Sequence, residues 1–388
     1  MTKAARPQGS SFLGSPREPQ PVVLQHAREA GIRQVIDRHG RLHDGEDPGL
    51  TPEQVRRLYE IMVTVRVLDE RGWELQRAGR VHFWIPSRGQ EAAHVASAAA
   101  LRDRDWVFLA DREPGVMLLR GASLEQIFSQ VFGRRDEPLQ GRRLPLLLGD
   151  RRRNIVPCTT QVGSYIPHAA GAAWAARLKG HDTRFIVYFG DGATSRGEFH
   201  SALNFAGIFR PPVIFFCQNN GWAVSTPTDR QTASETFAQK ADAYAVVGQR
   251  VDGNDIFAVH EVTRQAWEAA PQRGATLIEA VTYRLGFHTS SDNPDLYRTR
   301  SEVEAWAEWD PIARTRGFLA TYTGWTEDDD AALVRTIRDR VRDAIHRAEA
   351  KPLPGPADQF EHVFAEETWL LAEQRERLLA DLVDGATP

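Results

Sequence analysis

Several protein classes are excluded by what this sequence has little of. Only two of its 388 residues are cysteines. Cys158 and Cys217 form no metal-binding spacing, so we expect two reduced, buried thiols in a protein of the cytosolic type. No apolar run approaches membrane-spanning length, and the longest uncharged one, 211–217, has the length of a strand. The pattern therefore excludes a disulfide-rich fold and a chain with a membrane-spanning helix.

A strong excess of one charge is also missing. The chain carries 52 acidic and 48 basic residues, a formal net charge of −4, which argues against a general nucleic-acid binder. The amino terminus lacks the apolar segment of a signal peptide, so we expect a bacterial-type cytoplasmic protein with neither a nucleic-acid nor a membrane partner. The 41% hydrophobic share is sufficient for a substantial core.

The residue pattern divides the chain into three parts. Residues 1–50 are rich in proline, glycine and charge and show little periodicity, which predicts an extended arm or loose surface layer. Residues 51–300 alternate apolar runs with helical patterns, which predicts an α/β fold with a largely parallel sheet flanked by helices. Residues 301–388 are predicted to form a helical extension that packs on the same domain and breaks at the prolines of 352–356.

Individual elements can be placed from their caps and periodicity. A long helix is predicted to follow Thr51, because Thr51 can cap it, Pro52 suits its first position and Gln54 completes a capping box. We expect this helix to end at Gly79 and another helix to be capped by Ser195. The other expected elements are strands at 185–189, 213–217 and 276–284, and helices at 169–178, 197–208 and 256–270.

Two polar loops follow neighbouring apolar strands at the point where each strand should end. Gly-Asp-Gly at 190–192 comes directly after the strand 185–189, and Asn-Asn at 219–220 follows the strand 213–217. Ligands bind at the carboxyl ends of strands in open parallel sheets. A carboxylate and a carboxamide there suit Mg²⁺, which prefers oxygen ligands and shares them with phosphates and water. Each loop alone is a common turn, but the pair predicts a magnesium–diphosphate site.

These loops also make the chain similar to a known family. Gly-Asp-Gly, a spacer of 26 residues and Asn-Asn resemble the thiamin-diphosphate fingerprint. The stretches 189–195, 204–206 and 217–227 resemble the alpha subunit of the 2-oxo acid dehydrogenases, which is part of their decarboxylating component. The likeness extends from about Leu58 to Pro354. It is nearest to the branched-chain 2-oxoisovalerate type, because Ile-Phe-Phe-Cys precedes the Asn pair and Ser-Thr-Pro follows it.

The resemblance implies a role for eleven residues. Asp191, Asn220 and the backbone carbonyl of Trp222 would bind Mg²⁺. Arg112 would bind a phosphate of the cofactor. His288 is implied as a catalytic and cofactor-binding residue that binds phosphate or moves protons near the reactive carbon of the cofactor. The other cofactor-binding residues that it implies are Thr160, Val162, Gly190, Gly192, Ala193 and Gln218.

The family also implies partners. In its members, thiamin diphosphate and Mg²⁺ lie between an alpha and a beta subunit, and the beta subunit supplies the glutamate that activates the cofactor. The resemblance therefore implies an alpha2-beta2 heterotetramer in which this chain alone is inactive. The implied reaction is oxidative decarboxylation of a 2-oxo acid, with transfer of the acyl group to a lipoyl group on an acyltransferase component.

Three departures from the family pattern keep alternatives open. Asp111 stands where tyrosine is usual, Gln218 where branched-chain enzymes often carry arginine, and Arg196 where glutamate is usual. A carboxylate near a diphosphate is unfavourable unless it points away or pairs, although Arg196 could restore part of the charge. These departures motivate a cofactor-deficient scaffold subunit as an alternative. A pyruvate or acetoin enzyme also stays open, because the family shares its substrate pocket with the beta subunit, and a carboligase ranks last because it would need a second α/β domain. For His94 and His168, a structural place is about as plausible as a functional one.

Overall fold

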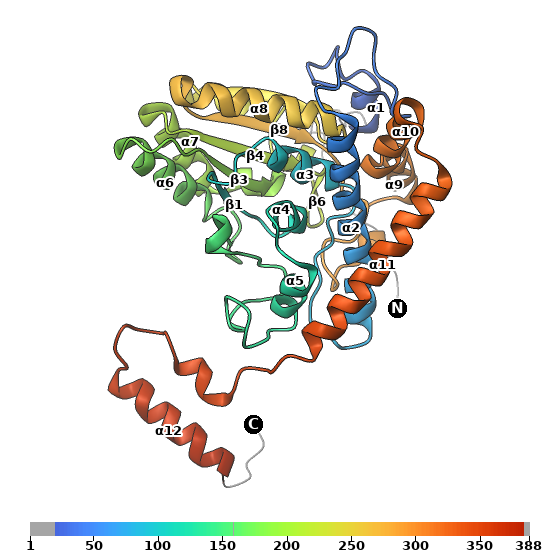
Figure 1. The fold of residues 1–388 in the computed structure, drawn as a ribbon. Coiled ribbons are helices and arrows are strands. Elements are labelled where there is room, and N and C mark those ends of the chain that lie inside the picture. Colours follow the sequence, from blue (N-terminus) through green and yellow to red (C-terminus); the bar gives the residue numbers. More distant parts are fainter. Residues whose placement is uncertain (1–19, 158, 384–388) are drawn as a thin grey trace, which may run out of the picture.

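The computed structural model describes residues 20–157 and 159–383. Within them, six strands form one parallel sheet in the order β2-β1-β3-β4-β8-β7. Helices flank this sheet, so the predicted α/β fold is confirmed (Figure 1). Cys217 is buried and free, whereas Cys158 lies outside the described residues. The strands are β1 (Trp106–Phe108), β2 (Ile155–Val156), β3 (Phe185–Gly190), β4 (Val213–Asn219), β7 (Val247–Asp252) and β8 (Thr276–Val281).

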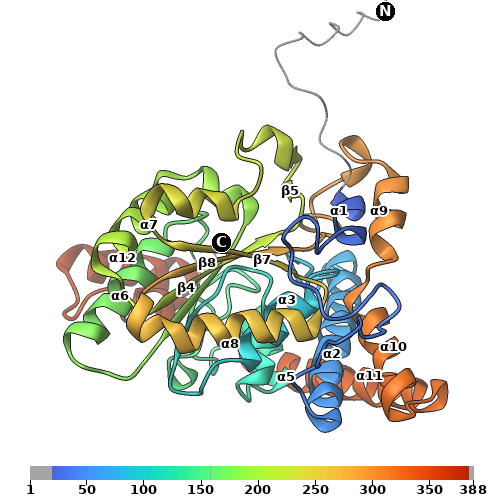
Figure 2. The same ribbon diagram turned by 90° about the horizontal axis from the view of Figure 1, so that it is seen from above.

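Alternation along the central strands divides the core into two layers. Ile186 and Tyr188 of β3 belong to the apolar cluster that contains α3 and α8. Phe185, Val187 and Phe189 belong to the cluster that contains α6 and α7. Successive side chains of a strand point to opposite faces, so a strand that is apolar on both faces needs two helical layers. Figure 2 shows β4 and β8 between α7 and α8. These helices are α3 (Glu91–Ala99), α6 (Ile166–Leu178), α7 (Gly197–Phe209) and α8 (Ile256–Arg273).

The start of α2 (Pro52–Arg77) confirms the predicted capping box. The N–H of Gln54 donates to Thr51 Oγ1 at 3.3 Å, and the N–H of Thr51 donates to Gln54 Oε1 at 2.8 Å. Gly79 follows the helix with a φ of +70°, which glycine adopts without strain.

Two other predicted boundaries are wrong. Residues 191–195 form a 3₁₀ turn, so Ser195 ends that turn and Arg196 occupies the cap position of α7, without a side-chain cap hydrogen bond. The strand predicted at 276–284 ends at Val281. Beyond it, the N–H groups of Thr282 and Arg284 donate to the carbonyls of Asn219, which ends β4, and of Asn220. Residues 282–284 are not part of the strand.

The described part of the predicted arm is not a loose layer. After α1 (Gln20–Gln25), the side chains of Ile32, Val35 and Ile36 are buried. The N–H groups of Val35 and Ile36 donate to the buried carboxylate of Asp255 at 2.6 and 2.8 Å. Sequence periodicity could not show this, because the contacts join residues more than 200 positions apart.

The carboxyl-terminal region is helical and is interrupted at the prolines of 352–356, as predicted, and it also breaks before Pro311 and at Gly324. The first three helices are α9 (Arg300–Ala307), α10 (Pro311–Thr323) and α11 (Glu327–Glu349). Helices α10 and α11 pack against α2, whereas α12 (Trp369–Val383) has no buried residue and lies apart from the main body (Figure 1). No helix of the described chain combines the length and apolarity needed to cross a membrane.

The remaining elements are short. Two helices follow β1, and a small antiparallel hairpin follows β4. Helices α4 and α5 are Pro114–Leu119 and Leu124–Val131, and the hairpin strands β5 and β6 are Trp222–Ala223 and Thr226–Pro227. The 3₁₀ turns are Arg151–Arg153, Asp191–Ser195, Thr228–Arg230, Ala238–Tyr244, Pro294–Leu296 and Pro356–Phe360.

Candidate active site

A cavity of about 450 Å³ lies at the carboxyl edge of the sheet, within the usual size range of small-molecule sites. Strands β2 and β3 lie on opposite sides of β1, so the winding of the sheet reverses there. Reversals of this kind create the crevice in which α/β proteins bind ligands. Segments that follow β1, β2, β3 and β4 all contribute to the cavity wall, which explains why its residues are far apart in the sequence.

All eleven residues implied by the resemblance line this one cavity. It therefore brings together the loops that the sequence placed at separate strand ends. The residues are Arg112, Thr160, Val162, Gly190, Asp191, Gly192, Ala193, Gln218, Asn220, Trp222 and His288.

The two polar loops contact each other directly. The backbone N–H of Asn220 donates to Asp191 Oδ1 at 3.3 Å. Asn220 Oδ1 accepts the N–H of Trp222 at 3.2 Å, and its Nδ2 donates to Gln90 Oε1 at 3.2 Å. The Asp191 carboxylate, the Asn220 amide oxygen and the Trp222 carbonyl thus belong to one short stretch of cavity wall, as required for oxygen ligands of one ion.

The environment of Asp191 fits a bound cation. The residue is 1% exposed, and burial raises the pKa of its carboxyl group. Its carboxylate accepts hydrogen bonds from the N–H of Asn220 and from Nε2 of Gln231, the latter at 2.6 Å, and no ion pair with it occurs among the described residues. A buried carboxylate without a counter-charge is costly, and a divalent ion would remove that cost. The described residues contain no group of three or more His, Cys, Asp or Glu side chains that could hold a metal ion. The ligands implied by the resemblance include only one such side chain, Asp191.

Gly190 and Gly192, in the loop after β3, are suited to a ligand that approaches the backbone closely. A Cβ atom at Gly192 would lie 2.7 Å from the Cβ of Ala223, so a side chain there would collide with the hairpin. A Cβ atom at Gly190 would meet open space. The small residues therefore keep the backbone of this loop accessible from the cavity.

His288 is bound between two arginines. Its Nδ1 lies 2.9 Å from Arg112 Nη2 and 3.1 Å from Arg284 Nη1. Guanidinium groups only donate, so Nδ1 is the acceptor and the ring proton is on Nε2. Burial, followed by the charges of Arg112 and Arg284, lowers the pKa of His288 to about 3. The imidazole is therefore neutral at physiological pH.

Four further residues of the site were not singled out from the sequence. Gln231 bonds Asp191, and Gln90 bonds Asn220. Arg284 donates to the carbonyl of Val224 at 2.7 Å, and burial lowers its pKa to about 10. Glu113 lines the cavity and accepts a hydrogen bond from Gln218 Nε2 at 2.5 Å. Gln90, Glu113 and Arg284 stand in short stretches that resemble the family, at 89–92, 112–113 and 283–288, and this resemblance was the only signal for them in the sequence.

Asp111 and Arg196, two of the departures from the family pattern, lie in different environments. Asp111 lines the cavity, and its carboxylate lies 3.9 Å from Arg112 Nε, which partly compensates its charge. Arg196 is half exposed and pairs with Glu198 at 3.1 Å. It therefore does not compensate Asp111.

The two histidines left open by the sequence occupy different environments. His168 is exposed on α6. His94 is fully buried on α3, and neither ring nitrogen has a hydrogen-bond partner within the described structure. Burial lowers the pKa of His94 to about 3, so it is a neutral core residue.

Comparison with known proteins assigns the family. Residues 59–357 match the Dehydrogenase E1 component family, and the chain belongs to it. The chain is similar to the mitochondrial 2-oxoisovalerate dehydrogenase subunit alpha of Homo sapiens, with 39% identity over 354 residues, which cover 90% of this chain and 80% of that protein. The subunit of Caenorhabditis elegans is 37% identical over 355 residues, covering 91% and 81%. Subunit alpha 2 of Arabidopsis thaliana is 36% identical over 333 residues, covering 85% and 71%.

Proposed function

We propose that this chain is the alpha subunit of a decarboxylating 2-oxo acid dehydrogenase component that acts on branched-chain 2-oxo acids with thiamin diphosphate and Mg²⁺. One observation carries this proposal: the eleven residues named from the sequence line a single cavity at the carboxyl edge of the sheet. The names of the relatives, 2-oxoisovalerate dehydrogenase subunit alpha, support the substrate class.

In this proposal the cavity wall binds the charged end of the cofactor. Asp191, Asn220 and the carbonyl of Trp222 would bind Mg²⁺, and the diphosphate and water would supply its other ligands. The backbone N–H groups of Gly192 and Ala193 belong to a 3₁₀ turn beside Asp191 and would donate to the diphosphate. Arg112 supplies a positive charge that the hydrogen bonds to Pro86 and His288 keep in position.

Thr160 and Val162 would contact the middle of the cofactor, which supplies the electron sink for decarboxylation. His288 would donate a hydrogen bond from Nε2, because its Nδ1 already faces two guanidinium groups. A neutral imidazole in that tautomer can stabilise an oxygen on which negative charge develops and can return a proton to it.

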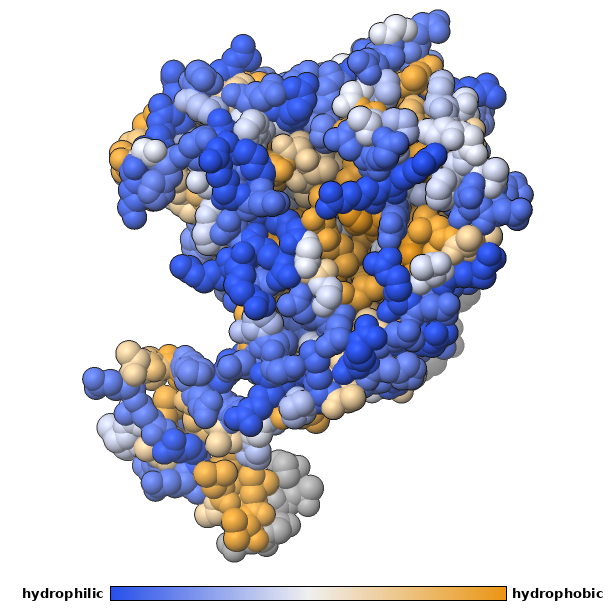
Figure 3. Space-filling view, in the orientation of Figure 1, coloured by the Kyte–Doolittle hydropathy of each residue, from blue (hydrophilic) through white to orange (hydrophobic). Residues whose placement is uncertain are grey.

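A partner subunit would complete the site. Three large apolar residues that line the cavity, Leu144, Val162 and Val224, are 53%, 55% and 48% exposed. Figure 3 shows hydrophobic surface near the centre of the main body, bordered by hydrophilic residues. Exposed apolar surface around a cavity is typical of a surface that binds another protein. We assign this face to a beta subunit, and the assembly to an alpha2-beta2 heterotetramer that delivers its acyl product to a lipoyl acyltransferase component.

Co-expression with a beta chain tests this function. The assembled complex should oxidise 2-oxoisovalerate with a higher kcat/KM than pyruvate, measured with an artificial electron acceptor. The purified chain alone should be inactive under the same conditions. Robust activity of the chain alone would contradict the shared site, and a preference for pyruvate or acetoin would replace the branched-chain assignment.

A cofactor-deficient scaffold is the second candidate, favoured by the pairing of Arg196 with Glu198 and not with Asp111. Calorimetric titration of the alpha–beta complex with thiamin diphosphate and Mg²⁺ decides between the two functions, since the scaffold binds neither.

A cytoplasmic location also belongs to the proposal, although the names of the relatives place those proteins in mitochondria. The division at residues 50 and 300 remains a prediction.

A further inference from the structure

A buried carboxyl group and a buried amide face each other in the cavity wall. Glu113 and Gln218 are both 2% exposed, and both line the cavity. Gln218 pairs with Gly190 in the register of β3 and β4, so it lies beside the Gly-Asp-Gly loop. Its Nε2 lies 2.5 Å from Glu113 Oε1, whereas its own Oε1 is buried without a hydrogen-bond partner in the described structure.

No guanidinium neutralises Glu113. The structure shows no ion pair to it among the described residues, because the Arg112 side chain donates to Pro86 and His288 instead. Glu113 Oε2 accepts only the backbone N–H of Arg112, at 3.3 Å. Burial, and next the charge of Asp111, raise the pKa of Glu113 to about 8. The charge of Arg112 acts in the opposite direction on the pKa of Glu113. The phenol of Tyr188 on β3, which is bonded to Ser97, is a further titratable group near Glu113.

The two orientations of the Gln218 amide differ in the atom that faces Glu113. With Nε2 toward Glu113, the amide Oε1 is buried without a hydrogen-bond donor in the described structure. The oxygen and nitrogen of a glutamine amide exchange places by a half-turn of the terminal group, with almost no change in shape. After such a half-turn, Oε1 of Gln218 faces Glu113 and accepts a hydrogen bond from its neutral carboxyl group. The NH₂ group of Gln218 then occupies the place where Oε1 had no hydrogen-bond partner.

We propose that Glu113 donates its carboxyl proton to Gln218 Oε1, so that the Gln218 NH₂ group is free to donate to an oxygen of the bound diphosphate. This inference rests on the proposed function, because it assigns a neutral hydrogen-bond donor to the same cofactor site. Gln218 contacts the ligand, and Glu113 is a positioning residue that acts through it. The pair explains how a site with a carboxylate at Asp111 and no arginine at position 218 can bind an anion.

A pH dependence follows from this arrangement. Loss of the Glu113 proton would turn the amide back and place a negative charge behind it, so affinity for the diphosphate falls as the pH rises through about 8. At pH 9, one unit above the pKa of Glu113, about one Glu113 carboxyl group in eleven still carries a proton. The dissociation constant of thiamin diphosphate should therefore rise about tenfold between pH 7 and pH 9. The same linkage requires that binding at pH 8.5 takes up a proton.

The test uses the assembled alpha–beta complex and thiamin diphosphate with Mg²⁺, titrated calorimetrically between pH 7 and pH 9. Glu113→Gln is the matched control, because its amide can donate to Gln218 Oε1 at every pH. The ratio of dissociation constants, wild type over Glu113→Gln, should be near 1 at pH 7 and about ten at pH 9. Titrations in buffers of different ionisation enthalpy should show proton uptake at pH 8.5 by the wild type only.

The inference is overturned if the ratio of the two dissociation constants stays constant from pH 7 to pH 9 and the wild type and Glu113→Gln take up equal numbers of protons. Failure of both proteins to bind at any pH overturns the proposed function instead. If Glu113→Gln does not assemble, Gln218→Met gives a second test, because methionine has similar volume but no donor. It should bind more weakly than the wild type at pH 7, and wild-type affinity of this variant at pH 7 contradicts the proposal.

Discussion

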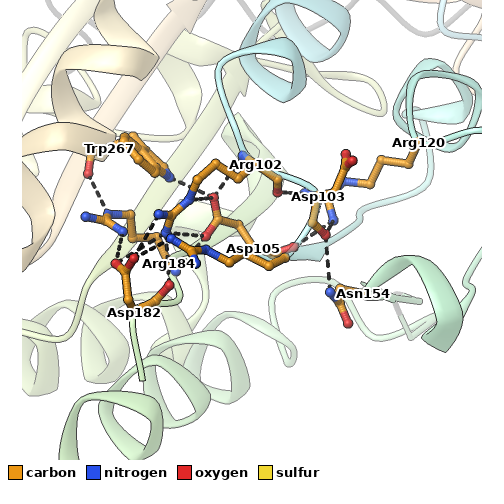
Figure 4. A network of polar contacts seen from close by, with 9 residues as sticks. Arg102, Asp103, Asp105, Arg120, Asn154, Asp182, Arg184 and Trp267 are labelled. Carbon is orange, nitrogen blue, oxygen red and sulfur yellow. Dashed lines mark hydrogen bonds and ion pairs between the residues drawn. The ribbon is translucent and has the colours of Figure 1, made fainter. Parts of the chain in front are cut away.

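The two edges of the parallel sheet differ in whether their carboxylates are paired with guanidinium groups. At the amino edge, the carboxylates of Asp105 and Asp182 in the network of Figure 4 each pair with at least one guanidinium group. At the carboxyl edge, Asp191 and Glu113 are buried without an ion pair among the described residues, and burial raises the pKa of each. The carboxylates of the first edge are compensated within this chain, whereas under the proposed function a bound ligand compensates those of the second.

The amino edge illustrates a saturated network. Asp105, which is fully buried before β1, accepts hydrogen bonds from the N–H groups of Arg102 and Arg184 and from Nε1 of Trp267. The guanidinium groups of both arginines also lie over the indole of Trp267, at 4.5 and 4.1 Å from the ring centroid. Asp182 pairs with both arginines as well. These contacts connect β1, β3 and α8, so this edge stabilises the fold.

The carboxyl edge shows the cost of a functional site. Gln90 Nε2, Gln218 Oε1 and Arg284 Nε are buried there without a hydrogen-bond partner in the described structure, and under the proposed function an ion and an anion bind beside them. Unpaired buried charge destabilises a fold but increases affinity for the ligand that neutralises it. The difference between the edges can therefore be tested by removing one charge at a time.

The largest effect is expected for Asp191→Asn. Loss of the carboxylate should weaken binding of thiamin diphosphate with Mg²⁺ at least about 100-fold in calorimetric titration of the alpha–beta complex. Because the folded state raises the Asp191 pKa, its carboxylate lowers stability as the pH rises, so the variant without cofactor should melt no lower than the wild type at pH 8. A lower melting temperature with unchanged affinity would make Asp191 a structural residue.

His288→Gln should have the next largest effect. We expect kcat of the complex to fall about 100-fold with little change in cofactor affinity, because the variant loses a proton donor. The wild-type histidine stays neutral above a pKa of about 3, so its kcat should show no loss from histidine protonation between pH 7 and pH 5.5. A decline in this range that is absent from His288→Gln would contradict the two-arginine environment.

Asp105→Asn tests the opposite edge. Removing the charge weakens bonds to Arg102, Arg184 and Trp267, so the free energy of unfolding should fall by about 2 kcal/mol. Chemical denaturation measures this change. The dissociation constant of thiamin diphosphate should stay within twofold of the wild type, and a larger change would show that the two edges are coupled.

Asp182→Asn should have the smallest effect, because the Asp182 side chain is 60% exposed. Hydrogen bonds from Arg102 and then Arg184 hold the pKa of Asp182 below its usual range, so its contribution is present at neutral pH and lost in acid. The melting temperature should fall less than in Asp105→Asn, and added salt should remove the difference from the wild type. Persistence of the difference in high salt would indicate that Asp182 contributes by packing.

The sequence predicted best where the signal is local. The Thr51 capping box, the buried strands and the loops at 190–192 and 219–220 were recognised because each depends on a few consecutive residues. The contacts of Gln231 with Asp191 and of Glu113 with Gln218 were not predicted, because they join residues 40 and 105 positions apart. Burial of the amino-terminal segment was missed for the same reason.

By itself, the sequence determined the fold class, the family and the set of residues around one site, because strand periodicity, turn glycines and collinear motifs are encoded along the chain. The tertiary structure decided the protonation of His288, the orientation available to Gln218 and the unpaired state of Asp191. Those properties depend on desolvation and on charges brought together from distant positions, and both arise only when the chain has folded.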